Sequence, residues 1–232
     1  MKESDIPDIR SLPLLCGMAD ENFDLLTRAA YIQNFPPQIE LISEGEPSDF
    51  LHIVVDGTVE LFAKWNDRET TMATVRSPGT FIVAASIMQS PYLMSARTLE
   101  KSRLVLLPSE DVRTLFTIDK GFAQAVVTEL SRCYRTLVKN TKNLKLRTAI
   151  ERLANYLIRK QANTGSAQSF MLDIEKRLLA SYLGMTPENL SRAIKALQPY
   201  GVSFDGAQVK ISDAKALLGL AKPSPLIDNA AL

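Results

Sequence analysis

Apolar and polar residues alternate in a different rhythm in each part of the chain. Between residues 32 and 107, short apolar runs are separated by turn residues. The clearest runs span 39–43, 50–55, 58–63, 71–75 and 104–107. Short strands at such regular spacing are typical of an antiparallel sandwich or barrel. Helical spacing precedes this region and follows it at 109–116, so the pattern predicts a β domain flanked by helices.

A long helix is predicted from residue 119 to residue 145. Asp119 is a candidate N-cap residue, and apolar residues then recur at spacings near 3.5. This period is typical of a coiled-coil seam, although an amphipathic helix packed on its own domain gives a similar pattern. We expect a two-fold dimer interface on this helix. Its predicted residues are Phe122, Val126, Leu130, Cys133, Leu137 and Leu144.

The C-terminal third carries two short helices joined by a tight turn. Gly184 ends the first helix, because glycine adopts a left-handed conformation without steric cost. Thr186 is a candidate N-cap residue for the second helix, and Pro187 suits its first position. Apolar residues at helical spacing predict the buried faces, namely Leu178, Leu179, Tyr182 and Leu183, then Leu190, Ala193, Ile194 and Leu197. The arrangement predicts a helix-turn-helix, whose second helix enters a DNA major groove.

Other signals extend this prediction to a winged helix-turn-helix. A further helix is expected from residue 146 to about residue 162, and a strand at 170–174. Asp205-Gly206 lies between two short strand-like segments, and this dipeptide is a strong hairpin signal. The hairpin is the expected wing. Charge agrees, because residues 1–138 hold 13 Lys+Arg against 19 Asp+Glu, a net of −6, whereas residues 139–232 hold 14 against 7, a net of +7.

Two motifs resemble those of a known family. Gly45-Glu46-Pro47, Asp56-Gly57-Thr58-Val59 and Pro78-Gly79-Thr80-Phe81 resemble, in this order, the jelly roll of cyclic-nucleotide-binding domains. The order Glu188-x-x-Ser191-Arg192 resembles the recognition helix of the CRP/FNR transcription regulators, in the branch of FNR and DNR. The resemblance implies an α+β fold and a homodimer. Its expected parts are a sensor β-roll at 1–118, a dimerisation helix at 119–145, a winged helix-turn-helix at 146–221 and a flexible tail at 222–232.

The same resemblance implies how DNA is read. Glu188, Ser191 and Arg192 share one helix face and are expected to read the bases of a TTGAT-like inverted repeat. The alternative is that Glu188 and Arg192 form only a surface ion pair. Phosphate contacts, which position the protein, are expected from Thr186, Asn189, Lys195, Lys176 and Arg177. The expected partners are therefore double-stranded DNA, a second copy of the chain and, for an activator, RNA polymerase.

The effector site departs from the family pattern. Members that bind cyclic nucleotides carry a glutamate and an arginine where this chain has Ala84 and Met94, so binding of cAMP is not expected. The apolar segment that replaces them resembles DNR, a haem-associated sensor of nitric oxide. A candidate pocket for haem or another apolar effector comprises Phe81, Val83, Ala84, Met88, Met94 and His52. Alternatively, these residues fill the core, and His52 is an ordinary strand residue.

Several classes of function are excluded by what the sequence lacks. Two cysteines, Cys16 and Cys133, do not suffice for an iron–sulfur cluster, and both are expected to be buried as small hydrophobes. A single histidine rules out a multi-histidine metal site, and no catalytic motif suggests an enzyme. With no long apolar run or signal peptide, we expect a cytoplasmic protein away from membranes. Two alternatives stay open: a regulator without effector, controlled by its abundance, and a small-molecule-binding protein whose helix-turn-helix contacts proteins.

Overall fold

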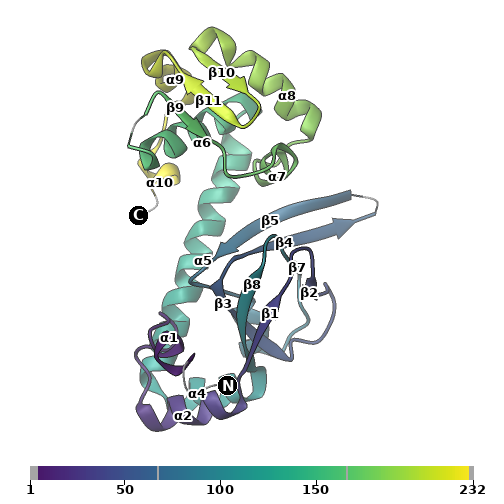
Figure 1. The fold of residues 1–232 in the computed structure, drawn as a ribbon, viewed down its shortest axis with the longest axis vertical. Helices are drawn as coiled ribbons and strands as arrows, with labels where there is room; N and C mark the ends of the chain where they lie inside the picture. Colours follow the sequence, from purple (N-terminus) through teal and green to yellow (C-terminus); the bar gives the residue numbers. More distant parts are fainter. Residues whose placement is uncertain (1–4, 67, 166, 230–232) are drawn as a thin grey trace. The chain divides into compact units, whose positions relative to one another are not determined.

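The computed structural model describes residues 5–66, 68–165 and 167–229 of the 232-residue chain (Figure 1). The chain forms two compact units, Met1–Cys133 and Tyr134–Leu232, which are called the N-terminal and C-terminal units below. The first contains two four-stranded β-sheets with helices, and the second is mainly helical with one small sheet. The predicted α+β class is therefore confirmed.

Two antiparallel sheets form the β-roll of the N-terminal unit. The first has the order β1 (Tyr31–Phe35), β8 (Ser102–Pro108), β3 (Phe50–Asp56) and β6 (Gly79–Phe81). The second has the order β2 (Glu40–Ile42), β7 (Ser95–Thr98), β4 (Thr58–Trp65) and β5 (Arg68–Arg76). Neighbours in each sheet are far apart in sequence, apart from the β4–β5 hairpin, as expected for a jelly roll. The jelly-roll prediction is confirmed, although the short strands β1, β6 and β7 were not predicted.

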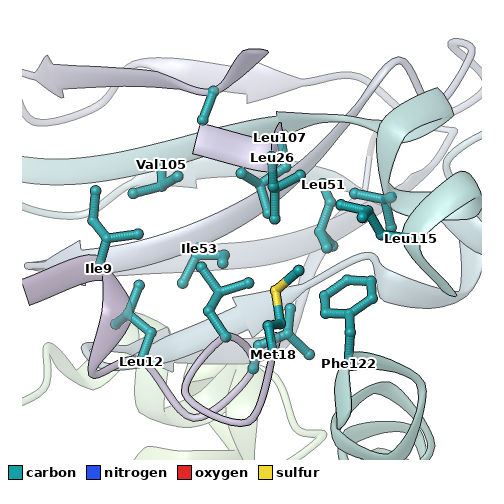
Figure 2. Packing of buried hydrophobic residues seen from close by; sticks show 14 of the residues in the cluster. Ile9, Leu12, Met18, Leu26, Leu51, Ile53, Val105, Leu107, Leu115 and Phe122 are labelled. Atoms are coloured by element: carbon teal, nitrogen blue, oxygen red, sulfur yellow. The ribbon is translucent and has the colours of Figure 1, made fainter. Parts of the chain in front are cut away.

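Alternation along the strands of the first sheet separates two hydrophobic cores. Leu104 of β8 and Val54 of β3 point into the roll, whereas Val105 and Ile53 point to the outer face of the sheet. The interior core contains Ile42, Val54, Val59, Leu61, Phe81, Tyr92, Ala96 and Leu104. Helices cover the outer face and bury the second core, which Figure 2 shows with Leu26, Leu115 and Phe122 gathered over the strands.

One carboxylate joins two of the helices that cover the outer face, α2 (Asp20–Ala29) and α5 (Lys120–Leu146). The covering helices are α1 (Ile6–Arg10), α2, α4 (Ser109–Ile118) and the start of α5, while α3 (Val83–Met88) follows β6. Asp119 accepts hydrogen bonds from the Phe122 amide at 2.8 Å, which confirms its predicted capping role. It also accepts from the Ala19 amide at 3.0 Å and from Asn22 at 2.8 Å. Burial opposes its ionisation, but these donors outweigh burial and lower the pKa of Asp119.

The predicted dimer seam on α5 needs a correction. Phe122 and Val126 are fully buried in the outer core of their own unit, so they cannot form a contact with a second chain. Leu130 is half-buried against the same core. Cys133, Leu137 and Leu144 are exposed. The 3.5 period thus continues along the helix while its environment changes from core to solvent.

The C-terminal unit has the predicted winged helix-turn-helix. Its helices are α6 (Ala149–Asn163), α7 (Lys176–Tyr182), α8 (Pro187–Ala196), a 3-10 turn at Gln198–Tyr200, α9 (Ala214–Ala221) and α10 (Pro225–Asp228). A capping box of Thr148 and Glu151 starts α6. The hairpin of β10 (Val202–Asp205) and β11 (Gln208–Ile211) turns at Gly206, where φ is 58°, and β11 pairs with β9 (Ser169–Met171). The wing is where the Asp-Gly signal predicted it.

The prediction of a flexible tail at 222–232 is wrong for residues 222–229; residues 230–232 lie outside the described part. The helical turn α10 carries Asp228, whose side chain is 10% exposed. The Asp228 carboxylate accepts hydrogen bonds from Arg147 at 2.5 and 2.8 Å and from Arg159 at 2.8 Å. It also accepts one from the Ser224 amide at 2.7 Å. Burial opposes ionisation of Asp228, but these donors lower its pKa overall.

Candidate nucleic-acid interface

Helix α8 is amphipathic, and its apolar side anchors it in the unit. Leu190, Ala193 and Leu197 are buried, and Ile194 is half-buried against the same core. Thr186 caps the helix by accepting a hydrogen bond from the Asn189 amide at 3.3 Å. The predicted start and buried face of α8 are therefore confirmed. In α7 the prediction of burial is wrong for Tyr182, which is 38% exposed and makes an edge-to-face contact with Tyr156, and Leu178 is only half-buried.

The three residues predicted to read bases project from the opposite side of α8. Glu188, Ser191 and Arg192 are all exposed, and their spacing of three and four residues puts them on one face. A hydrogen bond from the Thr186 hydroxyl, followed by weaker help from nearby Arg192, lowers the pKa of Glu188. Glu188 is therefore an anionic acceptor at neutral pH. The Ser191 hydroxyl donates to the Pro187 carbonyl at 3.0 Å and keeps its lone pairs outward.

The residues predicted to contact phosphate also lie on exposed surface. Lys176 and Arg177 occupy the first turn of α7, and Asn189 and Lys195 lie on α8. Thr186 is exposed at the start of α8 and already uses its side chain as the cap. The structure therefore brings the eight predicted DNA-contacting residues onto the two helices of one motif.

Arg152 of α6 positions this motif, and sequence analysis missed it. Its guanidinium donates to the Leu183 carbonyl at 2.8 Å, to the Gly184 carbonyl at 3.2 Å and to the Arg147 carbonyl at 2.8 Å. Burial lowers the pKa of Arg152. Because all three acceptors are backbone carbonyls, the residue types at positions 147, 183 and 184 do not predict these hydrogen bonds. The sequence shows only that an arginine stands in the predicted helix, and it does not show the partners of that arginine.

Comparison with known families agrees with both units. Residues 32–119 match the family model of the cyclic nucleotide-binding domain, and residues 151–220 match that of the Crp-like helix-turn-helix domain. The chain belongs to the CRP/FNR superfamily of transcription regulators.

Individual relatives have low sequence identity to this chain but align with most of its length. The anaerobic regulatory protein of Pasteurella multocida is 26% identical over 189 residues, which cover 78% of this chain and 68% of that protein. The CRP-like cAMP-activated global transcriptional regulator of Mycobacterium tuberculosis is 24% identical over 207 residues, covering 87% and 92%. The structure of FixK2 from Bradyrhizobium japonicum has a TM-score of 0.67 at 23% identity, covering 84% of this chain and 98% of that one. This chain is therefore a DNA-binding regulator of the CRP/FNR type.

The residues predicted to line an effector pocket of this regulator are only partly brought together. Phe81 and Met94 pack in the interior core of the roll, whereas Val83 belongs to the outer core. Ala84 and Met88 are exposed on α3. Two open cavities of this unit, of about 450 and 370 Å³, are lined by other residues. The alternative that these apolar residues fill the core holds for Phe81, Val83 and Met94, and the six predicted residues do not line one common cavity.

His52 lies in the interior of the roll, 3% exposed, and stacks on Phe81 with ring centroids 5.1 Å apart. Its Nδ1 atom is buried without a hydrogen-bond partner. Burial lowers the pKa of His52 to about 4, so the imidazole is neutral at physiological pH. Neither cavity includes His52, and a haem at this ring would have to displace Phe81 and its neighbours. The residues present therefore do not fit an axial haem ligand.

Both cysteines contradict the expectation of burial. Cys16 is exposed at the rim of the larger cavity, and Cys133 is exposed on α5. Partial burial of the Cys133 thiol raises its pKa, and the nearby Glu129 carboxylate raises it further. The described residues hold no group of three or more His, Cys, Asp or Glu side chains placed to bind a metal ion. Across the same residues, none of the helices is long and apolar enough to cross a membrane.

Proposed function

We propose that this regulator binds, as a homodimer, an inverted repeat of TTGAT-like half-sites. The observation that carries the proposal is the outward face of α8, where Glu188, Ser191 and Arg192 are exposed together at the end of a capped helix. Arginine donates two hydrogen bonds to guanine O6 and N7, and an ionised glutamate accepts from the cytosine amino group. Each residue has the chemistry for one base of a TTGAT half-site or its complement.

A second face supports the homodimer. Beyond the buried part of α5, four exposed apolar residues and one half-buried one recur at spacings of three, four and seven, so they lie along one helix face; Val138 and Leu146 are also exposed but are not part of this series. This exposed seam comprises Val127, Tyr134, Leu137 and Leu144, with half-buried Leu130 between the first two. Exposed apolar stripes of this kind mark interaction surfaces. A two-fold axis along α5 would give two recognition helices for two half-sites about one helical turn, roughly 34 Å, apart.

Binding of synthetic duplexes tests the proposal. We expect the wild-type chain to prefer an inverted TTGAT repeat over a duplex with scrambled half-sites of equal length and composition. Arg192→Ala should weaken binding to the repeat by about 1–3 kcal/mol and remove the discrimination at the guanine. Fluorescence anisotropy at several salt concentrations gives both quantities.

Lys195→Ala is the matched control, since it removes one exposed cation from the same helix. A phosphate contact should weaken binding to both duplexes alike and reduce the salt dependence by about one counterion. If Arg192→Ala behaves like Lys195→Ala, Arg192 contacts phosphate and does not read a base. If the wild-type chain binds both duplexes equally, the proposed operator is wrong.

We further propose that cAMP does not control this regulator in the usual way. Ala84, at the position of the family's glutamate, is exposed and cannot accept a hydrogen bond from a ribose. Ser95, which follows the missing arginine, is buried and already accepts a hydrogen bond from the Glu44 amide at 3.0 Å. Millimolar cAMP should leave the thermal midpoint and DNA affinity unchanged, because a ligand stabilises only by binding the folded state. A raised midpoint would contradict this. Nitric oxide sensing, activation and contact with RNA polymerase stay predictions of the resemblance.

A further inference from the structure

The end of the long helix α5 touches the turn of the helix-turn-helix directly. Gly184, at the turn, has φ of 63°, and a Cβ atom on it would lie 2.4 Å from Cδ2 of Leu144. Leu144 belongs to the last turn of α5 and is 47% exposed. Glycine is therefore required at 184 twice, once by its backbone conformation and once by the close approach of Leu144.

A guanidinium links the same two places through the backbone. Arg152 holds the Arg147 carbonyl, one residue after α5, at the same time as the Leu183 and Gly184 carbonyls of the turn. The turn is otherwise closed by the Met185 amide, which donates to the Ala180 carbonyl at 2.9 Å. The planar fork of arginine fixes three acceptors in one geometry, which a lysine cannot do.

The junction itself is also fixed from its other side. The Arg147 side chain is 7% exposed and is held by Asp228 of α10 and by Asn143 of α5, the latter at 3.1 Å. Movement of the last turn of α5 therefore cannot be absorbed by a loose connection at residues 147 and 148. Such a movement would act on Leu183 and Gly184, and Gly184 lies three residues before the recognition helix begins.

We propose that Arg152 is the positioning residue that transmits the setting of the α5 end to the recognition helix. It acts with the Leu144–Gly184 contact, so that the geometry of the dimer helix determines the aim of Arg192. This inference rests on the proposed function, because it concerns how well α8 reads bases. Arg152 itself is not placed among the residues that contact DNA.

Substitution of Arg152 in the full-length chain tests this role. Arg152→Met removes the three hydrogen bonds, and Arg152→Lys keeps the charge but replaces the three guanidinium nitrogens by a single one, which cannot hold the three carbonyls in the same geometry. Both variants should lose about tenfold in affinity for the TTGAT repeat while keeping their affinity for the scrambled duplex relative to the control. The control is Lys160→Met, which removes one cation from the same helix, where it pairs with Asp173 at 2.5 Å far from the turn.

A purely structural role would lower the thermal midpoint without changing the ratio of the two affinities. The ratio is therefore the deciding quantity, and Arg152→Lys supplies it if Arg152→Met does not fold. An unchanged ratio in a folded variant overturns the proposal. Hydrogen exchange of the amides from 183 to 190 gives a readout without DNA, and exchange as slow in Arg152→Lys as in wild type also overturns it. If the wild-type chain does not discriminate between duplexes, the proposed function fails, while the exchange measurement still tests Arg152.

A double-mutant cycle tests the second contact. Gly184→Ala should weaken binding to the repeat, partly because alanine is strained at this φ and partly because its Cβ meets Leu144. The backbone strain of Gly184→Ala is the same when Leu144 is replaced by alanine. Any loss of dimer contacts caused by Leu144→Ala is present both with and without Gly184→Ala, so it cancels in the comparison. We expect the factor by which Gly184→Ala weakens binding to the repeat to be at least fivefold smaller in the Leu144→Ala background than in the wild-type chain. Equal penalties in both backgrounds would show that Leu144 does not transmit anything to the turn.

Discussion

The two units of this regulator treat their predicted functional residues in opposite ways. In the C-terminal unit, Glu188, Ser191 and Arg192 stand free on a helix whose other face is buried. In the N-terminal unit, His52 and Phe81, which were predicted to line an effector pocket, are buried and packed against each other. A recognition surface needs only the right side chains on a fixed element, whereas a ligand pocket needs space that neighbouring side chains leave open. The predicted recognition residues therefore stay accessible, whereas His52 and Phe81 are enclosed by their neighbours.

The strongest way to sharpen this comparison uses the two faces of α5. Phe122→Ala should lower the free energy of unfolding of the N-terminal unit by about 3–5 kcal/mol, because the ring is fully buried in the outer core. Leu137→Ala, at a side chain 61% exposed, should leave that free energy unchanged and weaken the dimer instead. Urea unfolding and sedimentation of both variants separate the effects. If Phe122→Ala weakened the dimer without lowering the free energy of unfolding, Phe122 would belong to the dimer interface and not to the core.

The C-terminal unit offers the next largest effect, at Asp228. Asp228→Ala leaves the Arg147 guanidinium buried with only Asn143 as a side-chain partner. We expect a loss of about 2–3 kcal/mol in thermal unfolding, slightly less than for an entirely unpaired buried charge. Asp205→Ala, at an exposed carboxylate of the wing, should stay within about 0.5 kcal/mol of wild type. Similar results for both variants would mean that α10 contributes nothing to the unit.

A pH titration tests whether the roll interior really is closed around His52. The unfolded chain takes up a proton near pH 6.5, whereas the buried imidazole resists protonation until about pH 4. Stability is therefore complete above the first value and falls as pH drops toward the second, by about 2 kcal/mol between pH 7 and pH 5. His52→Leu should remove this slope. Because His52 is the one histidine in the sequence, its proton NMR signal reports the pKa without assignment. A normal pKa would show an open, hydrated roll.

The smallest expected effect concerns the cap of the recognition helix. Thr186→Ala removes the hydrogen bond to the Asn189 amide and should cost about 1 kcal/mol of stability. Thr186→Ser keeps the cap and should restore the thermal midpoint. Since serine retains the hydroxyl for both the cap and the predicted phosphate contact and alanine retains it for neither, affinity for DNA should follow stability across the two variants. An alanine variant with wild-type stability would show that the interior of α8, and not its cap, fixes the start of the helix.

Local rules explain why the DNA-binding motif was predicted well. Gly184, Thr186 and Pro187 each act within a few residues along the chain, and the spacing of Leu190, Ala193 and Leu197 gives the helix register. These signals need no knowledge of distant residues. For the same reason the wing hairpin was predicted from two residues.

Contacts between distant residues explain what was missed. The period of 3.5 along α5 is the same where Phe122 is buried in the core and where Leu137 is exposed, so periodicity alone cannot tell the core from a seam. Helix α3 is flanked by Ile82 and Gln89, both with positive φ, a backbone conformation that these residue types rarely adopt. Two of the three partners of Arg152 are backbone carbonyls 31 and 32 residues away. No sequence pattern identifies such an acceptor.

The carboxylate of Asp119 has a consequence for how the N-terminal unit is made. It accepts hydrogen bonds from Ala19 and Asn22, which are about a hundred residues earlier in the chain. On a ribosome, α2 is synthesised long before the residue that fastens it, at about 5–20 residues per second. For several seconds Leu15 and Leu26, fully buried in the finished unit, have no core to enter. The nascent chain therefore presents a hydrophobic segment that a chaperone can bind until the start of α5 emerges.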